Sequence, residues 1–240
     1  MIRTHDLVTG VLAVLALVPA AAAAPPELTA APPPRLPVAL SLDLETTWRL
    51  DQGYRLFSSS RTASKTGVSL SYDVTRAAGA PLLALGVGYH GESSNGDWAN
   101  GRVGLDVASG SLSAALRWPV LSWLEPQLRV AADLTRARFW IESREAALVD
   151  SAWSAGASAG AGLRLRTGTA RIAAMPGRAR FALAGIIEGG FHVGQPLSFA
   201  ARRQATVTTP TDDRISAAPV TLGSLGRSYP YLRLSLALVF

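Results

Sequence analysis

The sequence predicts an all-β protein that closes into an antiparallel up-and-down transmembrane β-barrel of about eight strands. Three observations carry this prediction. Apolar and polar residues alternate with a period of two in one segment after another, as they do in a strand with one apolar and one polar face. The connections between these segments alternate between long and short. The final ten residues form one unbroken alternating run.

The first 37 residues are expected to lie outside the barrel. Residues 1–24 have the layout of a secretory signal peptide, with Arg3 in a short polar start, an apolar run over 7–17 and small residues over 20–24. A single membrane anchor is the alternative, but the apolar run is too short for one. Residues 25–37 hold six prolines and are expected to form a flexible leader. Residues 38–240 are then the outer-membrane β-barrel.

The composition fits a barrel wall better than a helical membrane protein. Of the 240 residues, 48% are hydrophobic and 17% charged. Beyond residue 24 no stretch approaches the 18 or so apolar residues that a membrane-spanning helix needs. The apolar residues are spread thinly, as expected where every second residue faces a lumen. The absence of cysteine excludes disulfides and cysteine metal sites, and we expect no cofactor and no metal.

Eight alternating segments are predicted to be strands. In the first, leucines at positions 40, 42 and 44 alternate with Ser41, Asp43 and Glu45. A soluble sandwich would show the same alternation in any one strand. In the fourth segment the apolar parity changes near Ser109, which predicts a β-bulge at Gly110. The sixth is rich in Ala and Gly and is expected to be a slim strand that leaves room beside it. The segments are 38–48, 68–75, 83–90, 102–118, 128–135, 155–166, 181–192 and 231–240.

The predicted connections fall into two classes. With the N-terminus in the periplasm, the long ones lie outside, at about 50–65, 91–101, 140–154 and 193–227. The inner ones, near 76–81, 119–126 and 167–179, are mostly shorter. Outer-membrane barrels have this asymmetry, whereas a soluble sandwich has no reason for it. The last outer loop carries five charged residues, Arg202, Arg203, Asp212, Asp213 and Arg214. Its arginines could contact lipopolysaccharide phosphates, although a solvated loop without a ligand is the alternative.

Aromatic residues cluster near the predicted strand ends, as in the two girdles of a membrane barrel. Ordinary hydrophobic packing is the alternative explanation. The predicted outer girdle is Trp48, Tyr89, Trp140 and Phe191, and the inner one is Trp118, Trp123, Phe181 and Phe240.

Residues 231–240 resemble the terminal β-signal of bacterial outer-membrane proteins, which ends in an aromatic residue preceded by alternating apolar residues. Leu234, Leu236, Leu238 and Phe240 occupy the matching positions. The glycine that often begins this signal is replaced by the Tyr231–Arg233 segment. Residues 38–240 as a whole look like the small barrels that include the OmpA transmembrane domain and OmpX. That resemblance implies an outer-membrane location and recognition by the barrel assembly machinery, and it carries no functional motif.

The predicted inward faces carry charges of both signs. An eight-stranded barrel is narrow enough for side chains to fill, and arginine can form two hydrogen bonds to one carboxylate. We therefore expect a plugged lumen, with Arg164 or Arg233 paired with Glu188 or Asp43; a narrow channel with a charged lining is the alternative. The expected lumen charges are Asp43, Glu45, Asp73, Arg117, Arg129, Asp133, Arg164, Glu188 and Arg233.

The net charge is +6, and Lys65 is the only lysine. A basic balance indicates nucleic acid or anionic lipid, and an exported barrel meets lipopolysaccharide, although a GC-rich genome would also favour arginine. The expected partners are outer-membrane lipid, lipopolysaccharide and the barrel assembly machinery, with no nucleic acid. The barrel is expected to be a monomer in the cell outer membrane of a Gram-negative bacterium.

Three functions remain open: a structural or surface-interaction barrel, which we favour, a small passive pore, and a lipid hydrolase. Outer-membrane lipid hydrolases carry a His-x-Ser-Asn element in which the histidine activates the serine. After His90, the serines at 93 and 94 fall one or two places too far along the chain. A metal site on His90 and His192 has no supporting spacing. We therefore expect no enzyme.

Overall fold

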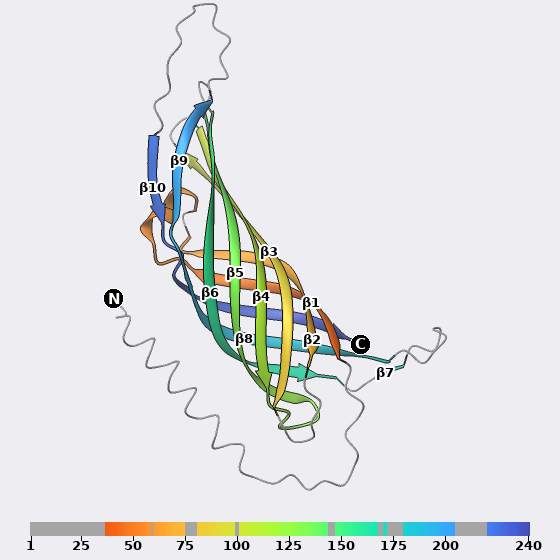
Figure 1. Cartoon of the computed structure of the whole chain (residues 1–240). Helices are drawn as coiled ribbons and strands as arrows, with labels where there is room; N and C mark the ends of the chain where they lie inside the picture. Colours follow the sequence, from red (N-terminus) through yellow and green to blue (C-terminus); the bar gives the residue numbers. More distant parts are fainter. Residues whose placement is uncertain are drawn as a thin grey trace, which may run out of the picture.

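The computed structural model describes residues 37–58, 60–74, 81–98, 101–143, 147–167, 170–171, 180–204 and 220–240. The predicted signal peptide and nearly all of the proline-rich leader lie outside these residues. Eight of the described strands close into an antiparallel barrel, with β11 paired to β1 and β6 paired to β8 (Figure 1). The predicted all-β, eight-stranded transmembrane barrel is confirmed. Its strands are β1 (Val38–Trp48), β2 (Thr62–Asp73), β3 (Leu82–Trp98), β4 (Gly101–Arg117), β5 (Leu124–Ser143), β6 (Ala147–Arg166), β8 (Arg180–Gly194) and β11 (Tyr229–Val239).

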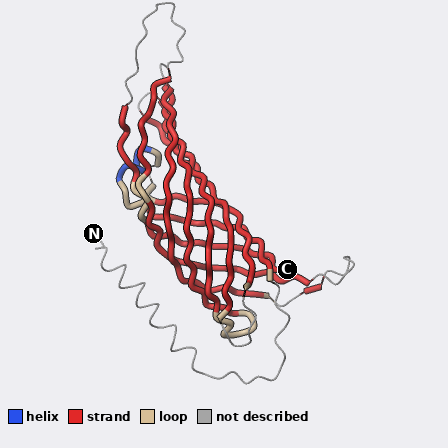
Figure 2. Tube along the Cα trace, in the orientation of Figure 1, coloured by secondary structure: helices blue, strands red, loops and turns tan. Residues whose placement is uncertain are grey.

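Three further strands and one short helix decorate the barrel. β7 (Ala170–Arg171) pairs with the inner end of β8. β9 (Leu197–Gln204) pairs with the outer end of β6, and β10 (Val220–Leu225) pairs with β9. The 3-10 helix η2 (Gln52–Leu56) lies in the β1–β2 connection, at the same end as β9 and β10 (Figure 2). No helix in the described part of the chain is long and apolar enough to span a membrane.

An apolar belt encircles the outside of the barrel. Leu42, Leu112 and Leu236 are 63%, 67% and 58% exposed, while their strand neighbours face inward. A continuous apolar surface of this kind marks contact with lipid rather than water. Trp48 and Tyr89 are exposed near the outer edge of the belt, and Trp123 and Phe240 near its inner edge, where the aromatic girdles were predicted.

The predicted β-bulge at Gly110 is wrong. β4 pairs with β3 and with β5 without a shift in register. Leu112 faces outward, whereas Val103 and Leu105, on the alternate face, are 3% and 0% exposed. The change of apolar parity therefore marks the level at which β4 leaves the membrane. Below this level its apolar side chains face lipid, and above it they face a protein core.

The outer loops predicted at 91–101 and 140–154 are also wrong. β3 and β4 continue to Trp98 and Gly101, and β5 and β6 to Ser143 and Ala147, so the strands themselves project outward. The predicted loop 193–227 contains β9 and β10, and β9 includes both Arg202 and Arg203. The remaining charges of that loop, Asp212, Asp213 and Arg214, lie outside the described residues.

A hydrophobic cluster, here called the outer cap, closes the outer mouth of the barrel. Phe139 of β5 packs edge-on against Phe57, with ring centroids 5.5 Å apart, and contacts Phe199 of β9 at 5.7 Å. The strand extensions, the β1–β2 connection and the β9–β10 hairpin all contribute to this cluster. Its buried members are Tyr54, Phe57, Val103, Leu105, Ala137, Phe139, Ala152, Leu197, Phe199 and Leu225.

Candidate functional site: a charged lumen

Strand alternation delivers polar side chains to the lumen at every level of the barrel. Odd-numbered residues of β1, β2, β4, β5 and β11 point inward, as do even-numbered residues of β3, β6 and β8. The structure places all nine of the predicted lumen charges on this inner face. Seven carboxylates in the described lumen each lie within 4.0 Å of an arginine, lysine or histidine nitrogen.

Two ion pairs occupy the inner part of the lumen. Arg117 Nη1 lies 2.7 Å from Asp73 Oδ1, which joins β4 to β2 across β3. Arg164 Nη1 lies 3.4 Å from Glu125 Oε2, so Arg164 does not pair with either of its two predicted partners. Beyond them, at the periplasmic end, small apolar side chains pack together: Ala39, Ala182, Ala184, Ala237 and Val239.

Glu188 of β8 is the centre of the middle layer, and it has no exposed surface. Arg233 of β11 approaches it to 2.7 Å and Arg129 of β5 to 3.6 Å. Tyr231 Oη and Gln127 Nε2 donate to its two oxygens, each at 3.0 Å. Both oxygens therefore have partners, as a buried carboxylate requires.

A second layer joins β1, β2 and β3. His90 Nε2 lies 3.3 Å from Asp43 Oδ2, and Ser69 Oγ donates to the same oxygen at 2.7 Å. Next to it, Lys65 Nζ donates to Glu45 at 3.0 Å and to the Tyr229 hydroxyl at 2.7 Å. These bonds again fix charged groups from neighbouring strands to one another inside the barrel.

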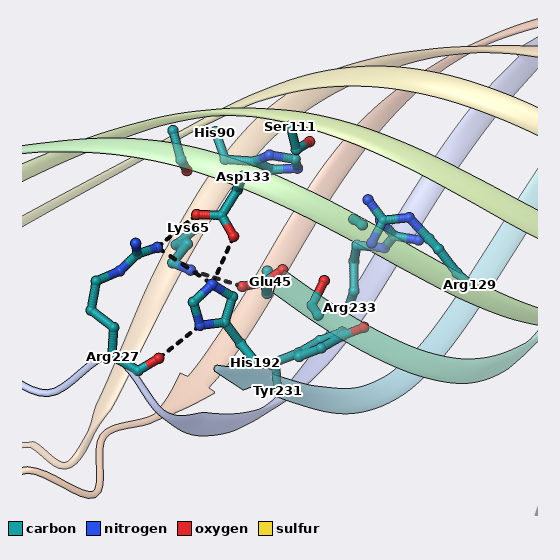
Figure 3. Close-up of a pocket in the computed structure, with 13 residues that line it drawn as sticks. Glu45, Lys65, His90, Ser111, Arg129, Asp133, His192, Arg227, Tyr231 and Arg233 are labelled. Atoms are coloured by element: carbon teal, nitrogen blue, oxygen red, sulfur yellow. Dashed lines mark hydrogen bonds and ion pairs between the residues drawn. The ribbon is translucent and has the colours of Figure 1, made fainter. Parts of the chain in front are cut away.

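His192 of β8 holds the outermost layer of the lumen together (Figure 3). Its Nδ1 lies 2.8 Å from the Arg227 carbonyl, and its Nε2 lies 2.7 Å from Asp133 Oδ1. Asp133 also accepts from Arg227 Nη2 at 2.8 Å, so the carboxylate is matched by a guanidinium. Both ring nitrogens therefore lie within hydrogen-bonding distance of an oxygen, and Arg227 Nη2 lies 3.4 Å from Nε2. The ring stacks on Tyr229 at 4.7 Å.

Arg49 connects the lumen to the outer cap. Its guanidinium pairs with the buried Glu92 and lies between the rings of Tyr54 and Tyr229, 4.5 Å and 4.6 Å from their centroids. A guanidinium over an aromatic face is stabilised by the ring's electron density. Arg49 therefore joins the outer cap to the ion-pair layers of the lumen.

A cavity of about 40 Å³ lies among the charged groups, with Glu45, Lys65, His90, Asp133 and Arg233 in its lining. This is room for about three water molecules. In Figure 3, side chains from several strands converge on this space.

Glycines of β6 make room for the larger lumen side chains, as the sequence predicts. A Cβ added at Gly160 would lie 2.4 Å from Tyr231 Oη, and one at Gly156 would lie 2.6 Å from His192 Nε2. β6 thus has glycines where the larger side chains of other strands need room in the lumen.

Several lumen residues were not predicted from the sequence. Lys65, Glu92 and Glu125 continue the inward parity of strands that were predicted too short, so their signal was present. Arg227 lies in the β10–β11 connection, where no alternation exists to find it. The missed lumen residues are Arg49, Lys65, Glu92, Glu125, Gln127 and Arg227.

In the structure, neither Ser93 nor Ser94 lies next to His90. His90 faces the lumen, whereas Ser93, three residues later, is exposed on the opposite face and donates to Asp106 at 2.7 Å. Ser94 shares the inner parity but lies four residues, or about 13 Å, further along the strand. Within the described residues, no group of three or more potential metal ligands occurs.

Comparison with known proteins finds similarity at the level of structure. No protein-family model and no curated protein sequence matches the chain. Neisserial surface protein A is 11% identical, with a TM-score of 0.49 over 85% of this chain and 97% of that one. Ail, the attachment invasion locus protein of Yersinia pestis, solved with the heparin analogue sucrose octasulfate, is 10% identical, with a TM-score of 0.37 over 85% and 95%. The transport unit of the Escherichia coli autotransporter AIDA-I is 10% identical, with a TM-score of 0.40 over 89% and 93%.

The chain is an integral β-barrel of the bacterial outer membrane. The closed strand ladder leaves no unpaired edge within the belt, and the belt presents apolar side chains to lipid. Closed barrels with this outward apolar band are the spanning structures of outer membranes.

Proposed function

We propose that this protein is a non-conducting outer-membrane barrel whose structural or surface-interaction role is carried by its projecting strands and outer cap. The observation that carries the proposal is the paired charge inside the barrel. Ion pairs join its strands at successive levels of the lumen, and the outer cap lies at the outer end.

The ion pairs that join non-adjacent strands inside the barrel argue against a passive pore. Glu188 on β8 meets Arg129 on β5, although β6 separates the two strands, and Asp43 on β1 meets His90 on β3 across β2. An ion would have to break several of these pairs in turn. Leaving one partner of a buried pair alone costs about 3–5 kcal/mol.

The proposed partners are outer-membrane lipid, lipopolysaccharide and the barrel assembly machinery, with the barrel as a monomer. The apolar side chains at the end of β11 support the third partner, because Leu234, Leu236 and Phe240 lie on the lipid-facing side, 44%, 58% and 45% exposed. The projecting strands support a surface role, because β3 to β6 carry the chain beyond the apolar belt.

A liposome-swelling assay tests the proposal. Proteoliposomes of the refolded barrel, placed in an isotonic arabinose solution, are expected to swell no faster than protein-free liposomes, with a general porin as the positive control. Swelling that increases with the amount of barrel would contradict the closed lumen and favour the pore.

A further inference from the structure

Two arginines lie on the outer face of the wall, just above the apolar belt. On β5 the outward residues are apolar up to Leu134, and the next two on that face are Arg136 and Arg138, both exposed. Within the part of the chain that the structure describes, neither guanidinium lies within 4.0 Å of a carboxylate. Asp106 lies opposite Arg138 on β4, and it accepts a hydrogen bond from Ser93 at 2.7 Å.

Trp153 of β6 lies directly opposite Arg136 in the β5–β6 ladder and is 61% exposed. The Arg136 guanidinium lies 5.9 Å from the centre of its ring. Tryptophan favours the membrane–water interface, so the ring marks the level of the lipid headgroups. An uncompensated arginine is thus held at the depth where lipid phosphates lie.

The wall below Trp153 is recessed. β6 presents Ala155, Ala157 and Ala159 outward, where β1 and β11 present leucines. At the outer end of this alanine row, a shallow depression of about 430 Å³ opens where β6 and β8 separate, bordered by Ala155, Gly156, Val193, Gly194 and Gln195. Its apolar border and its position in the belt suit a hydrocarbon chain.

We propose that this part of the β5–β6–β8 wall is a binding site for lipid A, the phosphorylated and acylated anchor of lipopolysaccharide. Arg136, assisted by Arg138, binds a phosphate, while an acyl chain lies in the depression and along the alanines. The site has lipid A as its neighbour because it faces the outer leaflet, and its positive charge matches the phosphate. The inference rests on the proposed lipopolysaccharide partner and names the surface that meets it.

Native mass spectrometry of the folded barrel in detergent, titrated with purified lipid A, tests this site. The double variant Arg136→Gln/Arg138→Gln is expected to bind lipid A about tenfold more weakly, since it removes charge-assisted hydrogen bonds. Ala155→Trp, which fills the depression, is expected to weaken binding to a similar extent. The matched control, Arg55→Gln/Arg61→Gln, removes two exposed arginines of the β1–β2 region and should bind as wild type does.

Two further ligands decide which chemistry is recognised. Lipid A without its phosphates should bind wild type and the double variant equally weakly. Phosphatidylglycerol binding equal to that of lipid A would overturn the assignment, as would unchanged lipid A binding by the double variant. If the control pair loses binding and the double variant does not, lipopolysaccharide is still a partner but meets another surface. If wild type itself does not bind lipid A, lipopolysaccharide is not a partner of this barrel.

Discussion

Glu188 shows at the scale of a single residue how this barrel tolerates charge in its interior. The carboxylate is fully buried and bonded to Arg233, Tyr231 and Gln127, with Arg129 nearby. Burying such a group is costly unless each oxygen is paired, and here each oxygen is paired. Replacing the whole cluster by apolar side chains need not lower the stability of the barrel, whereas removing one member does.

Glu188→Ala is therefore expected to destabilise the barrel by about 3–5 kcal/mol, because two arginines lose their partner in a buried place. Urea unfolding of the barrel in lipid vesicles measures this loss. Glu142→Ala, which removes an exposed glutamate from the outward face at the outer end of β5, serves as the control. A loss no larger than that of the control would show that the Glu188 cluster is solvated.

Gly160 contributes to stability by having no side chain. A Cβ there would meet Tyr231 Oη at 2.4 Å and the Gly189 carbonyl at 3.0 Å. Gly160→Ala is expected to destabilise the barrel by about 1–3 kcal/mol through overpacking. Gly110→Ala, where a Cβ would meet nothing within 4 Å, is expected to be nearly neutral in the same unfolding experiment. Equal effects at the two glycines would contradict the crowded lumen.

At the scale of the element, β4 shows both the success and the limit of alternation as a signal. Period-two alternation located all eight barrel strands, because each has a lipid face and a lumen face. It ended several of them too early, because the outward face becomes polar and the inward face apolar above the membrane. The flip at Ser109–Gly110 was visible in the sequence, but a bulge and a change of surroundings produce the same pattern.

The two faces of β4 can be compared by making the same Leu→Ala substitution on each face. Leu105→Ala removes a fully buried side chain from the outer cap and is expected to cost about 2–4 kcal/mol. Leu112→Ala, on the same strand but 67% exposed to lipid, is expected to cost less because lipid fills the space. Limited proteolysis of the projecting strands, alongside unfolding, detects the loosened cap. Greater sensitivity in the Leu112 variant would contradict the placement of the membrane boundary.

At the scale of the whole molecule, the charges of the lumen could be predicted more easily than their pairing. Nine inward charges followed from parity alone. Arg164 pairs with Glu125, its direct partner in the β5–β6 ladder, and Glu125 lies before the predicted start of that strand. Arg227 comes from a connection between strands, where no alternation predicts it. The outer cap could not be predicted from alternation, since its residues come from six separate segments of the chain.

Single-channel recording in planar bilayers tests the central claim, a filled lumen under an outer cap, most directly. The refolded full-length barrel, inserted at known density, is expected to give no steady conductance above the bare bilayer over the voltage range where a general porin conducts. Discrete, reproducible, ohmic steps that scale with the number of inserted barrels would contradict the account, because ions would then be passing where the structure places Glu188, Asp133 and Arg49.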